Sequence, residues 1–154
     1  MEDQALLHWE DFQLGDVVEF GDKLVTREEV IEFATEFDPQ PFHLDEEAAK
    51  QSILGGLCAS GWHSCAMLMR MMCDDYILRS ASMGAPGVDE VRWSKPVYVG
   101  DRLRARRTCI DRRPSSSRPS MGLTRFRTEV INQKDEIVMT LVGWAMYRRR
   151  SVEG

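Results

Sequence analysis

The segment FDPQPFHLD, residues 37–45, holds an aspartate and a histidine five positions apart, with two prolines between them. Pro39 and Pro41 restrict the backbone angles of the segment, which limits how far its carboxylate and its imidazole can separate. At short range such a pair, here Asp38 and His43, can bind one water molecule, with one group accepting a proton while the other donates one. The spacing therefore indicates an acid–base pair.

The same residue types also have ordinary structural roles. Asp38 can be a turn former and His43 a loop histidine, and for Asp45 we expect the role of N-cap of a following helix. One Asp/His pair does not specify a reaction, so spacing alone leaves both interpretations open. His63 is expected to be structural. We expect no metal site from His43, Asp45 and His63, because their spacing matches no familiar ligand pattern.

The elements around this turn follow from hydrophobic periodicity. Residues 16–25 are rich in strand-forming residues and are expected to enter a sheet. Thr26 and Glu29 form a capping-box pattern, and apolar residues at helical spacing predict a helix over 27–37. The prolines end this helix, since a residue before proline is pushed out of the α region. A second short helix is expected over 44–52.

The longest predicted helix lies within residues 55–78 and begins near Ser60 or Gly61. Its apolar residues occur nearly all round, which predicts burial. The second half of the chain is partly alternating and rich in β-branched and aromatic residues, which predicts strands. These strands are expected at 87–94, 101–112, 121–132 and 136–149. Residues 132–136 indicate a hairpin turn and residues 111–120 a polar loop.

Helices grouped early and strands grouped late predict an α+β fold, with the long helix packed on an antiparallel sheet. A length of 154 residues fits one domain, residues 1–154, with a core of its own. A single helix cannot cover both faces and both edges of a sheet, so we expect a homodimer or a higher homo-oligomer. The C-terminal segment RRRSVEG is expected to fray.

Composition excludes some partners. The net charge of −5 argues against nucleic-acid binding. No apolar run is long enough to span a bilayer and the N-terminal sequence resembles no signal peptide, so we expect a cytoplasmic protein without a membrane partner. The four cysteines form no C-x-x-C pattern and are expected to be reduced.

Charge is unevenly distributed along the chain. Residues 1–50 hold fifteen acids and three bases, whereas residues 101–154 hold six acids and thirteen bases. One interpretation of the basic second half is a solvated face. The other is that some of its arginines bind an anionic group such as a nucleotide phosphate.

Three segments resemble the MaoC-like family of (R)-specific enoyl-CoA hydratases and acyl dehydratases. The family's turn reads aspartate, any residue, asparagine, proline, any residue, histidine, any residue, aspartate, and FATEFDPQPFHLD follows it except at Gln40. Gly61 of GGLCASGWH lies eighteen residues after His43, as in the family. WSKPVYVGDRL, residues 93–103, resembles a family segment with Pro-Val followed by Gly-Asp.

The resemblance implies the hot-dog fold, a long central helix wrapped by an antiparallel sheet and paired into a dimer. It implies reversible addition of water across the α,β double bond of an acyl thioester such as an acyl-CoA, with no cofactor and no metal. Asp38 and His43 would activate the water, and the Gly61 N–H would face the thioester oxygen, where an unpaired amide stabilises developing charge. The resemblance also assigns Gln40 and Ser60, with Gly61, to the oxyanion and substrate-binding part of the site. Both depart from the family, which has asparagine and histidine there: the longer Gln40 side chain can change the geometry of the turn, and Ser60 is expected to be secondary.

Further roles are less specific. Trp62, Met67 and Met71 are candidates for an acyl pocket, although core packing is the expected role of each. Arg92, Lys95 and the arginines of residues 102–107 are candidates for CoA phosphates, and strand alternation would send only half of the latter to one side. Two alternative functions remain: a hot-dog thioesterase using Asp74 or Asp75 on the long helix, and a non-catalytic acyl-thioester-binding module.

Overall fold

In the computed structural model, which describes residues 5–152, helices gather in the first half of the chain and strands in the second. The helical elements are η1 (Trp9–Asp11), α1 (Arg27–Phe37), η2 (Pro41–His43), α2 (Glu46–Gln51), α3 (Gly61–Met72) and η3 (Cys73–Ile77). The strands are β1 (Val17–Leu24), β2 (Glu90–Trp93), β3 (Arg102–Pro114), β4 (Met121–Ile131) and β5 (Ile137–Arg148). This element order confirms the predicted α+β class.

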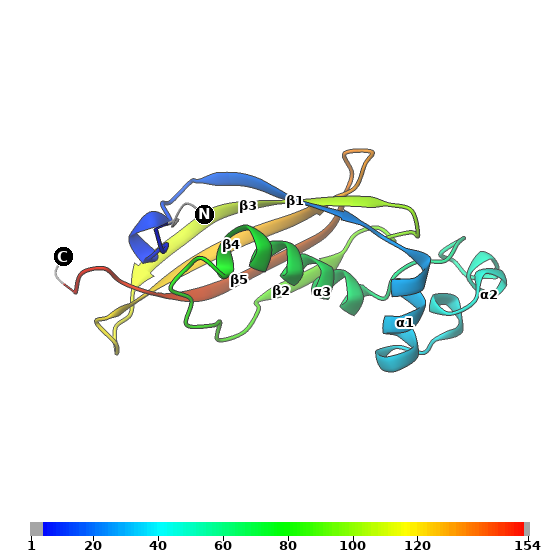
Figure 1. Ribbon diagram of the computed structural model, residues 1–154, viewed down its shortest axis with the longest axis horizontal. Helices are drawn as coiled ribbons and strands as arrows, with labels where there is room; N and C mark the ends of the chain where they lie inside the picture. Colours follow the sequence, from blue (N-terminus) through cyan, green and yellow to red (C-terminus); the bar gives the residue numbers. More distant parts are fainter. Residues whose placement is uncertain (1–4, 153–154) are drawn as a thin grey trace.

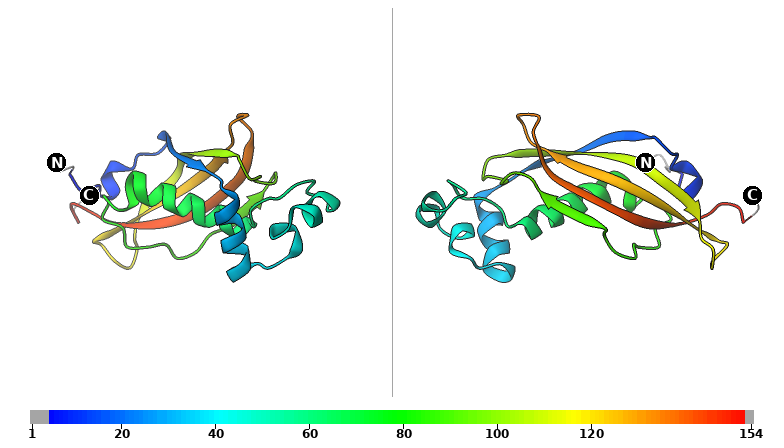
Figure 2. Two further views of the ribbon diagram at one scale, coloured as in Figure 1. Left: turned by 45° about the vertical axis from the view of Figure 1, so that its right-hand side comes forward. Right: turned by 180° about the vertical axis from the view of Figure 1, so that it is seen from behind.

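The five strands form one antiparallel sheet in the order β1-β3-β4-β5-β2. Helix α3 lies across one face of this sheet, and α1 and α2 lie together at one end of the molecule (Figure 1). The views in Figure 2 show the same arrangement, with both chain termini at the end opposite α1 and α2. Asp135 takes the positive φ of 61° in the predicted 132–136 turn, where the Asn132 side chain accepts the Glu136 N–H.

The core lies between α3 and the sheet. Met67, Leu68 and Met71 of α3 are buried there together with side chains of the strands. The opposite side of α3 is open in the isolated chain, where Trp62 and Met69 are exposed. The prediction that this helix is buried all round is therefore wrong for one apolar stripe, because a single sheet covers a single face.

One predicted boundary is confirmed and another differs from the structure. Helix α3 begins at Gly61, as expected, because Cys58 forms an antiparallel bridge with Tyr98 and the Ala59 N–H bonds to Val97. The predicted loop 111–120 begins later than expected. Strand β3 continues to Pro114 beyond a register shift, paired with β4.

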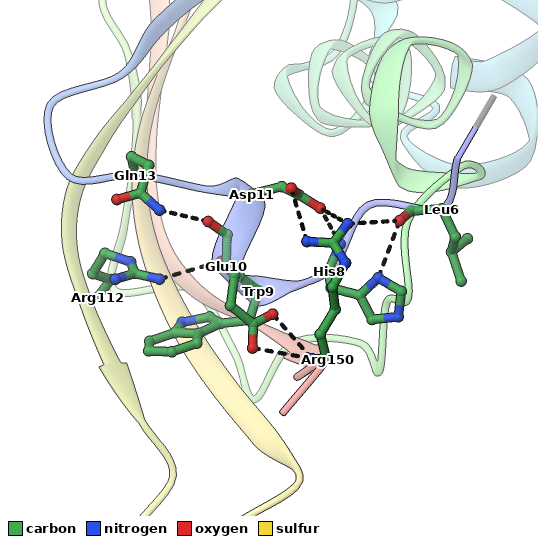
Figure 3. Close-up of polar contacts among 8 residues, drawn as sticks. All are labelled: Leu6, His8, Trp9, Glu10, Asp11, Gln13, Arg112 and Arg150. Carbon is green, nitrogen blue, oxygen red and sulfur yellow. Dashed lines mark hydrogen bonds and ion pairs between the residues drawn. The ribbon is translucent and has the colours of Figure 1, made fainter. Parts of the chain in front are cut away.

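The N- and C-terminal segments are joined (Figure 3). The Arg150 guanidinium pairs with Asp11 at 2.6 Å, and the Arg150 N–H bonds to the Glu10 carboxylate. Arg112 of β3 lies over the Trp9 ring, 3.9 Å from its centroid. The expected fraying is therefore wrong at Arg150, and the last two residues of that segment lie outside the described range. None of the helices within residues 5–152 has the length and apolar composition needed to cross a membrane.

Candidate active site

The end of α1 sets the position of the first candidate residue. Thr26 caps the helix by accepting the Glu29 N–H at 3.3 Å, as predicted, while the Glu29 carboxylate pairs with Lys23. Asp38 follows the last helical residue and, because it precedes Pro39, leaves the helical region with φ −152° and ψ 67°. Its carboxylate therefore projects beyond the end of α1.

The second proline starts the turn that carries the histidine. Pro41 is the first residue of η2, and His43 is its last, with a side chain that is buried. His43 Nδ1 lies 2.8 Å from the carbonyl oxygen of Cys58. Because a carbonyl oxygen only accepts, Nδ1 carries a proton, and in the neutral ring the lone pair is on Nε2.

The two side chains face one another. His43 Nε2 lies 3.5 Å from Asp38 Oδ2, which is long for a direct N–H···O bond. In the neutral ring both atoms are acceptors, so a donor placed between them satisfies both. A water or alcohol O–H has that ability. The turn thus brings together the pair that its sequence indicated.

Asp38 also accepts two side-chain hydrogen bonds. Ser60 Oγ donates to Oδ2 and Gln40 Nε2 donates to Oδ1, each at 2.6 Å. The Ser60 bond, the Gln40 bond and the nearby His43 hold the pKa of Asp38 below its ordinary value, although burial acts in the opposite direction. Asp38 is therefore an ionised carboxylate at neutral pH. Ser60 was expected to be secondary, yet it contacts this carboxylate directly.

Gly61 occupies the start of α3. Ser60 is the N-cap and accepts the Trp62 N–H at 3.3 Å, while Gly61, as the first helical residue, has an N–H without an intrahelical acceptor. The Trp93 indole packs directly on Gly61 and donates Nε1–H to its carbonyl oxygen at 3.0 Å. A Cβ at this position would lie 2.5 Å from the Trp93 ring, so the close contact requires glycine.

Four of the five predicted site residues line one cavity of about 430 Å³. They are Asp38, Gln40, His43 and Gly61. Ser60 is fully buried behind them. The apolar walls include Trp62 and Trp93, whose rings meet edge to face with centroids 5.3 Å apart. The cavity thus places a carboxylate, an imidazole and a helix N-terminus beside apolar surface.

Several other candidates lie outside this cavity. Asp45 is the N-cap of α2, as expected, and accepts the Ala48 N–H at 3.0 Å. Met67 and Met71 belong to the core. Asp74 is exposed in η3 and pairs with Arg70. Among residues 5–152 no group of three acidic, histidine or cysteine side chains is arranged to hold a metal ion.

His63 lies between α3 and α1. Its ring stacks on Phe33 at 4.8 Å and is buried, and burial lowers its pKa. Its Nδ1 has no hydrogen-bond partner in the described part of the chain. These contacts agree with the structural role expected for His63.

Of the basic residues considered for CoA phosphates, Lys95 lines the cavity and pairs with Glu136, which lies outside it. Arg102 and Arg104 project from the outer side of β3 and pair with acidic residues there. Arg107 points the opposite way and is buried. The expected alternation along this strand is confirmed.

Two contacts of the site had no signal in the sequence. The Cys58 carbonyl that fixes the His43 ring is a backbone group, which any residue would supply. The Trp93 indole reaches Gly61 only because β2 lies beside the start of α3. A tryptophan next to the Pro-Val segment was the one hint that an aromatic ring lies near the cavity.

Comparisons with known proteins agree with this geometry. The family model described as MaoC like domain matches residues 11–131. The crystal structure of the MaoC-like dehydratase from Rhodospirillum rubrum superposes with a TM-score of 0.86 at 38% identity, over 94% of this chain and 99% of that one. The uncharacterized protein YdeM of Bacillus subtilis is 27% identical over 126 residues, which are 82% of this chain and 88% of YdeM.

A third similarity is more local. The mesaconyl-CoA hydratase of Cereibacter sphaeroides is 44% identical over 64 residues, which are 42% of this chain and 18% of that enzyme. This likeness therefore concerns one segment of a much longer protein. Together with the sheet order and the central helix, the superpositions confirm the hot-dog fold.

Proposed function

Because this chain belongs to the MaoC-like domain family, whose relatives include hydratases and dehydratases, we propose that it adds water to, or removes water from, an enoyl thioester of the acyl-CoA type. One observation carries the proposal. Asp38 Oδ2 and His43 Nε2 lie 3.5 Å apart in a cavity that also contains the N-terminus of α3. Hydration of an enoyl thioester needs three features: an acid–base pair in position, apolar walls for the acyl group and an unpaired amide for the thioester oxygen.

In the hydration direction, a water molecule binds between Asp38 and His43 and its oxygen attacks C3 of the enoyl group. As the new C–O bond forms, the π electrons of the double bond move toward the thioester carbonyl. The pair accepts one proton from the water and delivers one proton to C2, so its total charge is unchanged after a cycle. Since both groups lie within reach of the same water molecule, we assign these steps to the pair rather than to either residue.

The negative charge that develops on the thioester oxygen needs a donor. The Gly61 N–H is proposed for that role, because it has no acceptor within α3 and lies at the positive end of the helix dipole. Loss of one such donor typically raises a barrier by about 2.7–4 kcal/mol. Gln40 and Ser60 would hold the Asp38 carboxylate ionised and correctly oriented through their two hydrogen bonds.

The decisive experiment compares two aspartates of the same turn. Asp38→Asn is expected to lower kcat for crotonyl-CoA hydration by about 10²–10⁴-fold, followed as loss of the enoyl-thioester absorbance. Asp45→Asn is the matched control, since asparagine is an equally good N-cap and Asp45 lies outside the cavity. Undiminished turnover by Asp38→Asn, or equal losses in both variants, would contradict the proposed role.

A homodimer in the cytoplasm is part of the proposal. The exposed stripe with Trp62 and Met69 and the edge strand β2 are surfaces that a second copy would cover. Light scattering coupled to gel filtration is expected to give about twice the chain mass of 17.7 kDa. A monomer at micromolar concentration would remove this part of the proposal without affecting the assignment of Asp38.

The alternative functions make different predictions. A thioesterase would release a free thiol from saturated acyl-CoA, and a binding module would bind enoyl thioesters without converting them. No contact in the described chain favours a thioesterase, because Asp74 and Asp75 lie about 20 Å from Gly61 along the helix axis. Thiol release and turnover measured on the same preparation distinguish the three possibilities.

A further inference from the structure

The site cavity and a second, apolar cavity each have α3 in their walls, with Trp93 of β2 in the first and residues of β5 in the second. The second cavity has a volume of about 270 Å³, and its walls include Met69 and Met72 of α3 and Leu141 of β5. Met69 is eight residues beyond Gly61, or about 12 Å along a helix that rises 1.5 Å per residue. The two cavities thus follow one another along α3, and they share no lining residue.

Three side chains occupy the space between these cavities: Cys65 of α3, Trp93 of β2 and Met139 of β5. Trp93 and Met139 are cross-strand partners, and the next inward-facing pair toward the second cavity is Val91 with Leu141. The sulfur atoms of Cys65 and Met139 lie 3.9 Å apart. We call Cys65, Trp93 and Met139 the sulfur–indole barrier.

The three side chains of the barrier differ in burial. Met139 is completely buried, Cys65 is half-buried, and Trp93, although 45% exposed, is held by its hydrogen bond to the Gly61 carbonyl. Neither Cys65 nor Met139 contributes to the walls of either cavity. The two cavities are therefore separate, and we place the barrier side chains between them.

The proposed function fixes where an acyl chain begins. With the thioester oxygen at the Gly61 N–H and C3 beside the Asp38–His43 pair, we place the remaining carbons along α3, in the direction of the barrier. Cys65 is four residues from Gly61, which is about 6 Å along the helix. A short acyl group fits within that distance, whereas a longer one meets Cys65 and Met139.

We propose that the sulfur–indole barrier restricts this protein to short acyl thioesters, an inference that rests on the proposed hydratase function. The barrier sets the length limit because a chain that continues past it must displace a buried methionine and a half-buried cysteine. One additional methylene on a substrate that the pocket cannot accommodate typically changes kcat/KM by about 10–200-fold. Shortening the barrier joins the two cavities and extends the pocket toward Met69 and Met72.

The test measures kcat/KM for crotonyl-, hexenoyl-, octenoyl- and decenoyl-CoA. The wild type is expected to prefer crotonyl- over octenoyl-CoA by about 100-fold or more, and Met139→Ala to reduce that preference by about tenfold or more. Met139→Ala leaves a cavity in the core and lowers stability, so Cys65→Ala, at a half-buried position, is the second variant. Met146→Ala is the matched control, because Met146 projects from the other face of β5.

Binding of saturated analogues provides a readout that needs no turnover. Calorimetry is expected to show that the wild type binds butyryl-CoA about tenfold or more tightly than octanoyl-CoA, with the difference reduced in Met139→Ala and Cys65→Ala. Equal binding of both analogues, or a preference left unchanged in both folded variants, would overturn the barrier proposal. Length-selective binding without hydration would instead retain the barrier and discard the hydratase function.

Discussion

The two ends of α3 bury charge in different ways. At the Gly61 end, the Asp38 carboxylate accepts hydrogen bonds from Ser60 and Gln40 and still faces the Nε2 atom of His43 across a cavity. Every partner at this end is a group that donates or accepts a proton. The cavity gives a ligand access to the lone pairs that remain.

At the other end, the Arg107 guanidinium lies among aromatic rings. Its carbon is 4.2 Å from the centroid of Tyr76 and 5.6 Å from those of Phe12 and Phe126. Ring faces stabilise the cation but neither accept nor supply a proton. A buried charge therefore points to chemistry only where its neighbours leave exchangeable protons and open lone pairs, as they do at the Gly61 end.

The largest expected effect tests whether Asp38 and His43 act as a unit. His43→Gln should lower kcat for crotonyl-CoA by about 10²–10⁴-fold, because it removes one half of the pair that binds the water. Adding Asp38→Asn to that variant should lower kcat little further, because the effects of substituting two residues that act together are not additive. Steady-state rates of the two single variants and the double variant measure this. Multiplicative losses would show that the two residues act independently.

The second largest effect is expected at Arg107, where a substitution should lower stability and leave kcat unchanged. Arg107→Ala should lower the free energy of unfolding by about 2–4 kcal/mol, because it removes a cation from three rings and leaves a cavity. Arg150→Ala, which removes the more exposed ion pair with Asp11, should cost about 1 kcal/mol or less. Urea titrations give both values. A large fall in kcat of folded Arg107→Ala would remove the distinction between the two ends of α3.

Sequence reasoning succeeded where the determinants are local. The cap at Thr26, the helix that ends before Pro39 and the turn that carries His43 depend on residues within a few positions of one another. It failed where distant strands decide. Strand β3 continues through the start of the predicted 111–120 loop to Pro114, because β4 pairs with it there.

The same distinction holds within the site. The motif indicated Asp38 and His43, but the contact of Ser60 with Asp38 joins residues 22 positions apart and depends on how α1 meets the start of α3. Trp93 approaches Gly61 across 32 positions, from a different strand. Such contacts are set by packing, so a linear pattern identifies the pair and leaves the groups that orient it unknown.

A smaller effect is expected from loss of the hydrogen bond between Ser60 and Asp38, which the sequence did not predict. Ser60→Ala should lower kcat/KM by about tenfold, and the acidic limb of the pH–rate profile should move to higher pH. The Ser60 hydrogen bond is the largest influence that lowers the pKa of Asp38, so its loss raises the pH at which the carboxylate becomes protonated. Ser60→Thr keeps a hydroxyl and should restore the profile. Ser80→Ala, a hydroxyl beyond the other end of α3, is the control. An unshifted limb in Ser60→Ala would show that Ser60 acts only as the helix cap.

The smallest effect concerns His63, a buried titratable group on the first turn of α3 that lies outside the site cavity. Burial lowers its pKa, while Glu29 raises it and Lys23 lowers it further. Below the ordinary histidine pKa the unfolded chain therefore binds a proton that the folded chain does not. This contribution makes the folded state less stable as pH falls, by at most about 1.4 kcal/mol per pH unit.

His63→Phe should remove this dependence, because phenylalanine keeps the stacking on Phe33 and has no nitrogen to protonate or leave without a partner. Urea titrations near neutral pH and about two units lower should show a smaller loss of stability in His63→Phe than in the wild type. Parallel losses would mean that His63 reaches solvent when protonated. An unchanged kcat in the variant would show that His63, like Arg107, supports the fold and not the reaction. A fall in kcat would instead indicate that His63 affects Asp38 through α1.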